Sequence, residues 1–118
     1  GLAQDKAFVI LGDLNADAVD GNAIKSGIQG LITHARVKDP KPSSEGGKHQ
    51  RKDNSNAKYH TAYWGMRADY VLPAKQQLNI INSGIFWPTV NEPEFRLIKD
   101  RAASSDHRLV WVDVAFKE

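Results

Sequence analysis

The 118-residue sequence contains no cysteine, and this absence removes several chemistries at once. Disulfide frameworks, cysteine-bound zinc sites and thiol nucleophiles are all excluded, so any metal ion must be held by oxygen or imidazole ligands. Carboxylate and amide oxygens are the ligands of hard divalent cations. The sequence therefore favours magnesium, manganese or calcium over softer metals.

The sequence also lacks a strong charge of either sign and a long apolar run. Its 16 basic and 14 acidic residues give a formal charge of +2, far from the dense basic stripe of a dedicated nucleic-acid-binding protein. No apolar run approaches the roughly 18 residues of a membrane span, so no membrane partner is expected. With 41% hydrophobic and 25% charged residues, the composition predicts one globular domain over residues 1–118.

Short apolar runs predict a small number of strands and one helix. The continuous run at residues 8–11 ends at Gly12 and predicts a strand that is buried on both faces. Apolar residues at helical spacing predict a short helix from about Gly21 to Leu31. Three more strands are expected at residues 69–72, 78–87 and 109–114, and residues 95–103 are expected to be helix or loop.

The segment of residues 38–58 is rich in Pro, Ser, Gly, Lys and Asn and has almost no apolar residue. This composition predicts a long, exposed and flexible loop, placed to act as a substrate-facing flap. His60, beside this segment, is expected to be solvated. Asp17 and Asp20 are expected to cap the positive end of the helix that follows them.

Three short segments place polar side chains at the ends of apolar strands. They are residues 12–17 (GDLNAD), residues 67–72 (RADYVL) and residues 104–108 (SSDHR). Each segment alone is a weak signal, because such short strings arise by chance. All three in this order form a specific pattern.

In this order the segments resemble the GD-x-N, R-x-DY-[IV]-L and SDH motifs of the endonuclease/exonuclease/phosphatase superfamily, whose fold is DNase I-like. The resemblance covers essentially the whole chain. It implies an α/β (α+β) fold, namely half of a four-layered α/β sandwich with a mixed, mostly antiparallel sheet and flanking helices. It also implies divalent-metal-dependent phosphodiester hydrolysis by a nuclease-like enzyme. Similar chain ends in secreted bacterial members imply a secreted or periplasmic location.

Phosphodiester hydrolysis requires an oriented water, a grip on the phosphate oxygens and a group that opposes developing negative charge. Asp13 follows a strand and a glycine, and we assign it to the attacking water. Asn15 is assigned to a phosphate oxygen, because its amide donates a hydrogen bond without adding charge. The alternative for both is a purely structural Asx-turn after the strand.

His107 is assigned to the scissile phosphate, because imidazole titrates near neutral pH and a nearby carboxylate can hold it as imidazolium. The resemblance pairs it with Asp69, which orients rather than attacks. The resemblance also implies that Asp106, together with Asp13, contacts the cation, which is Mg²⁺ or else Mn²⁺ or Ca²⁺. The expected substrate contacts are Asn15, Arg67, Tyr63 and Trp64.

The resemblance also implies that part of the active site lies outside these residues. The family's metal-binding glutamate, second active-site histidine and additional asparagine have no match here. We therefore expect the isolated chain to be inactive or nearly so. We also expect it to self-associate, or to bind a missing amino-terminal half, through an exposed apolar sheet face.

The motifs do not name the substrate. A mild positive charge and the basic segment 38–58 favour a polynucleotide, DNA or RNA, as the phosphodiester. Two other functions remain open from the sequence. One is a non-catalytic binding or scaffold module that retains the fold, and the other is a phosphomonoesterase.

Overall fold

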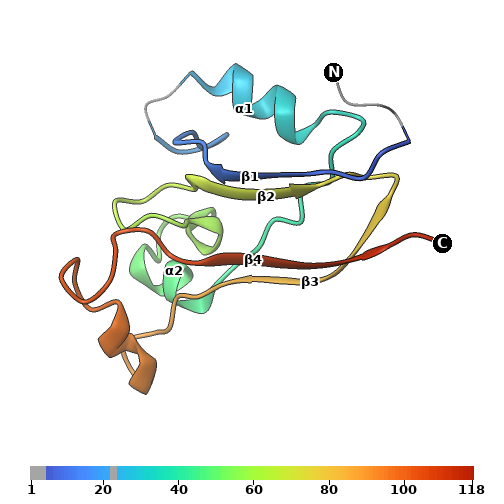
Figure 1. The fold of residues 1–118 in the computed structure, drawn as a ribbon. Coiled ribbons are helices and arrows are strands. Elements are labelled where there is room, and N and C mark those ends of the chain that lie inside the picture. The colour runs from blue at the N-terminus through green and yellow to red at the C-terminus, as the bar shows by residue number, and fades with distance from the viewer. Residues whose placement is uncertain (1–4, 22–23) are drawn as a thin grey trace.

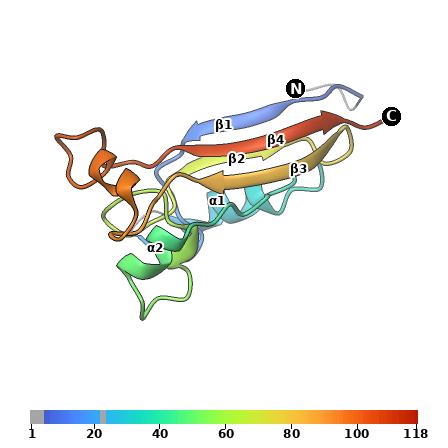
Figure 2. The same cartoon turned by 90° about the horizontal axis from the view of Figure 1, so that it is seen from below.

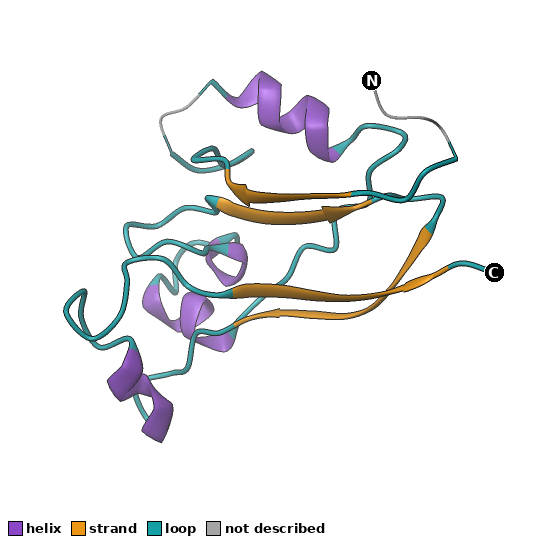
Figure 3. Ribbon diagram, in the orientation of Figure 1, coloured by secondary structure: helices purple, strands orange, loops and turns teal. Residues whose placement is uncertain are grey.

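The computed structural model describes residues 5–21 and 24–118. The predicted strands are confirmed, with boundaries shifted by a few residues. The chain forms β1 (Val9–Asp13), α1 (Lys25–Ile32), α2 (Glu45–Gln50), η1 (Ala57–Tyr59), β2 (Asp69–Pro73), β3 (Leu78–Ile85), η2 (Pro93–Leu97) and β4 (Val110–Phe116) (Figures 1 and 3). No helix in the described ranges is long and apolar enough to cross a membrane.

The strands form two antiparallel pairs, β1 with β2 and β3 with β4. In the first pair the register places Asp13, the last residue of β1, opposite Asp69, the first residue of β2. The second pair brings β4 beside β2 (Figure 1). His107 comes shortly before β4. With β4 beside β2, the histidine therefore lies near Asp13 and Asp69.

Helix α1 covers one face of β1 and β2. Its buried Ile28 packs with Tyr70 and Leu72 of β2 and with the partly buried Ile10 of β1. The predicted helix began at about Gly21, whereas α1 begins at Lys25, and residues 22 and 23 lie outside the described part of the chain. The core of this half therefore lies between α1 and the first strand pair.

The prediction that β1 is buried on both faces was wrong. Ile10 faces α1, but its neighbour Leu11 is 68% exposed. Figure 2 shows α1 and α2 on the same side of the strands, and among the described residues no helix covers the opposite side. Phe116 of β4 is also 76% exposed. An exposed apolar face on the strands is thus present, as the sequence predicted.

Residues 38–58, predicted as a long, exposed and flexible loop, are mostly exposed but are not all loop. This segment contains α2 and η1, and Gly46 and Gly47 of α2 are buried. The Gly46 amide donates to the backbone oxygen of Trp87 at 3.0 Å. A Cβ on Gly46 would lie 2.1 Å from the same oxygen, so only glycine permits this contact. The two buried glycines have no apolar side chain, which is why the composition gave no sign of their burial.

Asp17 and Asp20 do not cap α1, whose N-cap is Ile24. Asp17 is buried and accepts hydrogen bonds from the backbone amides of Val19, Asp20 and Arg67. The Asp20 carboxylate accepts hydrogen bonds from the side chains of Asn54, Asn56 and His60. These two carboxylates join the turn after β1 to segments more than thirty residues away.

His60 is fully buried rather than solvated, and its Nε2 lies 2.7 Å from Asp20 Oδ2. Burial raises the pKa of Asp20, but hydrogen bonds from Asn56, His60 and Asn54 outweigh burial and hold that pKa below its ordinary value. The Asp20 carboxylate is therefore an acceptor for its neighbours. It holds the segment of residues 54–60 against the turn that follows β1.

Candidate active site

Asp13 ends β1 in a turn that positions both of its oxygens. Gly12 has φ of +142°, a backbone conformation that favours glycine. Asp13 Oδ1 accepts a hydrogen bond from the Asn15 backbone amide at 2.9 Å, and Asn15 has a φ of +48°. The Asx-turn considered as an alternative is therefore present. It does not exclude a functional role, because Oδ2 lies 3.8 Å from His107 Nε2.

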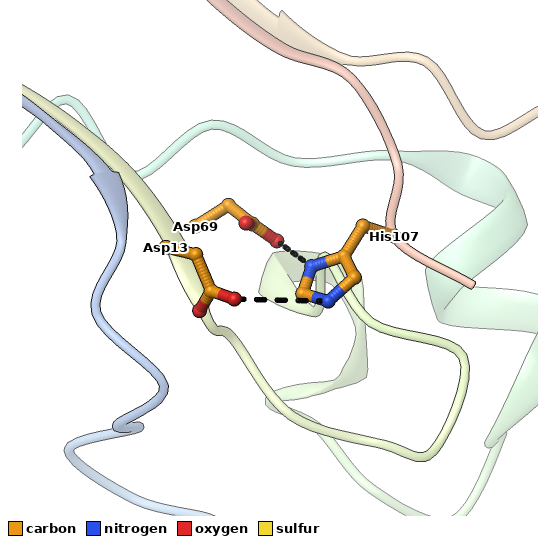
Figure 4. Close-up of side chains that lie close together, drawn as sticks. All are labelled: Asp13, Asp69 and His107. Atoms are coloured by element: carbon orange, nitrogen blue, oxygen red, sulfur yellow. Dashed lines mark hydrogen bonds and ion pairs between the residues drawn. The ribbon is translucent and has the colours of Figure 1, made fainter. Parts of the chain in front are cut away.

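His107 lies between two carboxylates (Figure 4). Its Nδ1 lies 2.8 Å from Asp69 Oδ2. Because an ionised carboxylate can only accept hydrogen bonds, Nδ1 is the donor, and Nε2 is the nitrogen that faces Asp13. The histidine side chain is 29% exposed, whereas Asp13 is 50% exposed. A substrate can therefore approach this site from the side of Asp13.

Thr61 also holds Asp69, and the sequence reasoning missed it. Its hydroxyl donates to Asp69 Oδ2 at 2.7 Å and accepts from the backbone amides of Ala68 and Asp69. The Thr61 carbonyl also accepts from the Arg108 amide at 2.7 Å. Thr61 therefore links the strand that carries Asp69 to the segment that carries His107. No periodicity or motif in the sequence marks a threonine eight residues before the aspartate.

The pKa of His107 is raised above its ordinary value of 6.5. The hydrogen bond with Asp69 is the largest cause, burial opposes it, and the charges of Asp69, Asp13 and Asp106 add to the rise. The site therefore favours the charged imidazolium more than a free histidine side chain does. A fixed imidazolium beside an exposed carboxylate is suited to stabilising negative charge on a bound phosphate.

Asp106 does not form part of the cluster of Asp13, Asp69 and His107, but it lies close enough to act on His107 through its charge. Its carboxylate is 3.6 Å from the exposed guanidinium of Arg101, and its carbonyl accepts from the Tyr63 amide at 2.8 Å. Ser105 accepts from the His107 amide at 3.0 Å, so it shapes the turn that presents the histidine.

Of the two aromatic residues predicted to contact substrate, Trp64 packs against the histidine and Tyr63 is exposed. The Trp64 ring packs edge-on against the His107 ring, with centroids 5.1 Å apart. Tyr63 is 60% exposed. Both side chains lie on the surface rather than in the core, and Trp64 is the one beside His107.

The structure does not place Arg67 with Asp13, Asp69 and His107, so its predicted contact with substrate stays a prediction. Its guanidinium is 7% exposed and donates to both oxygens of Asp39, each at 2.7 Å. It also lies over the Tyr70 ring at 4.2 Å. Burial raises the pKa of Asp39, but the hydrogen bonds and charge of Arg67 outweigh burial and lower it. Arg67 therefore serves a buried ion pair that secures the start of β2.

The donors at this edge suit a hard divalent cation. Asp13, Asp69 and His107 lie close enough together to hold a metal ion. Asp69 Oδ2 and Nδ1 of His107 are already bonded to each other, however, whereas Asp13 is the more exposed of the two carboxylates. Asp106 offers a second carboxylate whose charge acts on His107. Carboxylate oxygens of this kind fit Mg²⁺, Mn²⁺ or Ca²⁺.

Asp69→Asn should lower the pKa of His107 toward 6.5, because it removes the largest cause of the shift. A His107 pKa that is higher in the folded protein than in the unfolded chain stabilises the fold fully below about pH 6.5. That stabilisation is lost as the pH rises through the folded value. NMR titration of the His107 Cε1 proton measures the shift directly. Asp113→Asn, on the exposed part of β4, is the matched control. Equal His107 midpoints in the Asp69→Asn variant and the unmodified protein would contradict this assignment.

Comparison with known proteins identifies the family. The model of the Endonuclease/Exonuclease/phosphatase family matches residues 1–107, which includes all three motifs up to His107. Searches of curated proteins and of solved structures gave no significant match. The helices and antiparallel strand pairs form a partial DNase I-like α/β fold. The chain belongs to the endonuclease/exonuclease/phosphatase family, a family of largely hydrolytic enzymes.

Proposed function

We propose that this chain carries the His107 side of a divalent-metal-dependent phosphodiesterase active site. The observation that carries the proposal is the geometry of one histidine, bonded to Asp69 through Nδ1 and facing Asp13 through Nε2. If the pair of His107 and Asp69 were purely structural, the exposed carboxylate of Asp13 would not be needed near Nε2 of His107. Membership of a nuclease and phosphatase family supports the same chemistry.

In this proposal the side chains divide the tasks of phosphodiester hydrolysis. Asp13 orients and partly deprotonates the attacking water. The exposed Asn15 amide donates to a phosphate oxygen. His107, held as imidazolium by Asp69, opposes the negative charge that develops on the phosphate. A divalent cation held by Asp13 and Asp106 would supply further neutralisation of the phosphate oxygens.

We further propose that the 118 residues alone turn over diesters slowly or not at all. The described carboxylates near His107 are few, and the resemblance assigns a metal-binding glutamate and a second histidine to residues without a match here. Binding of a diester should nevertheless be measurable at the His107 side, because Asn15 and His107 are both in place. Substrate binding and turnover are therefore separate readouts.

The test uses dimethyl phosphate, with Mg²⁺, in an NMR titration of the chain. The His107 ring and Asn15 side-chain signals should shift in the unmodified protein, and removal of Mg²⁺ by chelator should weaken binding. The shift of the Asn15 signal should be lost in His107→Ala and kept in His34→Ala, which alters an exposed histidine after α1. Any hydrolysis of bis(p-nitrophenyl) phosphate should fall at least about 100-fold in His107→Ala.

Two results would contradict the proposal. One is diester binding or hydrolysis that persists in excess chelator and in His107→Ala. The other is the absence of both binding and hydrolysis in the unmodified chain. Faster hydrolysis of p-nitrophenyl phosphate than of its diester would instead support a phosphomonoesterase.

We also propose that the exposed apolar face of the strands drives self-association of the isolated chain. Leu11 and Phe116 are 68% and 76% exposed, and Phe116 lines a shallow apolar cavity with Phe8, Val9 and Val114. Exposed apolar surface of this kind is typical of an interaction face. Sedimentation equilibrium should therefore give a mass above the 13.1 kDa of one chain. The substitution Phe116→Gln should shift the protein toward monomer. A monomer at every concentration tested would disprove this partner assignment.

A further inference from the structure

Arg108 is buried without all of its hydrogen bonds. It is 6% exposed, yet its Nε has no partner among the described residues. Its Nη1 donates to the Ser105 carbonyl at 3.0 Å, and its guanidinium lies over the Trp87 ring at 4.7 Å. Buried polar groups normally have partners, and an unpaired donor on a charged group points to a ligand or a water that supplies the acceptor. The motif reasoning assigned no role to this residue.

Arg108 lies between two cavities on the active-site side of the chain. The smaller, of about 340 Å³, is reached beside Trp64 and Asp106. The larger, of about 530 Å³, extends to Lys52 and His49 of the segment that was expected to be a flap. The two cavities share Tyr63, Ile98, Lys99 and Arg108. The two cavities therefore adjoin, and we call them together the groove. At one end the groove reaches Trp64, whose ring packs against His107, and at the other it reaches α2.

The charge of this groove suits an anion. The larger cavity is lined by Lys52, Lys99 and Arg108 and by no carboxylate. None of these three cations forms an ion pair with another described residue. The smaller cavity does contain Asp100 and Asp106. Asp106 lies near Arg101, and Asp100 accepts a hydrogen bond from the Ala103 amide. The positive charge therefore increases away from the scissile position.

The groove also offers flat surfaces to a base. Tyr63 is exposed and lines both cavities, and Trp64 packs against His107 at the entrance. Aromatic faces beside cations that follow a backbone are the usual means of binding single-stranded nucleic acid. A small diester would fill the site at His107 and leave this groove unused.

We propose that the groove binds the strand of a polynucleotide next to the scissile phosphate. Arg108, Lys99 and Lys52 contact the flanking phosphates, and Tyr63 stacks on a base. This inference rests on the proposed function for the position of the scissile phosphate. It adds a second phosphate subsite, and it predicts that the chain prefers a substrate with several phosphates over a lone diester.

The test measures binding of a fluorescein-labelled eight-nucleotide oligothymidylate by anisotropy, in chelator so that no cleavage occurs. Lys52→Ala with Lys99→Ala should weaken binding about tenfold and reduce the slope of log Kobs against log salt by about 1.4, for two lost phosphate contacts. The matched control is Lys75→Ala with Lys117→Ala, which removes the same charge at the far end of the strands. Arg108→Lys keeps the charge and should also weaken binding, provided that its melting temperature equals that of the unmodified protein.

Three outcomes would overturn the proposal that the groove binds a polynucleotide strand. They are equal losses in the groove and control variants, no binding by the unmodified chain, or competition by poly-glutamate as strong as that by unlabelled oligonucleotide. Failure of the proposed function is recognised separately, from dimethyl phosphate binding at His107. That binding should be unchanged in Lys52→Ala with Lys99→Ala. If dimethyl phosphate does not bind while the groove variants still lose oligonucleotide affinity, polynucleotide binding in the groove is supported and the proposed hydrolytic function is contradicted.

Discussion

The candidate site depends on one carboxylate oxygen, Oδ2 of Asp69. It accepts hydrogen bonds from the Thr61 hydroxyl at 2.7 Å and from His107 Nδ1 at 2.8 Å. Thr61 and Asp69, which are close in the chain, therefore meet the distant His107 at a single atom. The same contact raises the pKa of His107 and directs Nε2 toward Asp13. The orientation of the His107 ring and its raised pKa therefore have the same cause, and loss of this oxygen would affect both.

Buried polar contacts elsewhere keep this oxygen in place. The Arg67 guanidinium pairs with Asp39, and the Arg67 amide donates to Asp17. Both contacts lie just before Asp69, so they secure the strand end from which the carboxylate projects. Removing one member of a buried ion pair typically costs about 3–5 kcal/mol, because the other charge is left without a partner. The conspicuous arginine of the second motif therefore supports the site by holding the backbone.

The sequence alone predicted the strands well, together with three of the residues that the fold brings close together. Apolar runs located all four strands, and the three motifs placed Asp13, Asp69 and His107, which the fold brings together. Contacts between distant segments were not predictable. Periodicity says nothing about the pairing of His60 with Asp20, which are forty residues apart, or about Thr61 beneath Asp69. The packing of Gly46 against the Trp87 backbone was invisible for a related reason, since a glycine leaves no apolar signal.

The central claim is that the cluster of Asp13, Asp69 and His107, with Asp106 near His107, is the functional one. The described residues contain a second cluster able to hold a metal ion, Asp17 with Asp20 and His60, but its carboxylates are occupied by internal donors. Paramagnetic broadening by substoichiometric Mn²⁺, read from the backbone amide signals, separates the two clusters. The account predicts the strongest broadening at Asp13, Asn15 and Asp106. Strongest broadening at Asp17, Asp20 and His60, or uniform broadening, would contradict it.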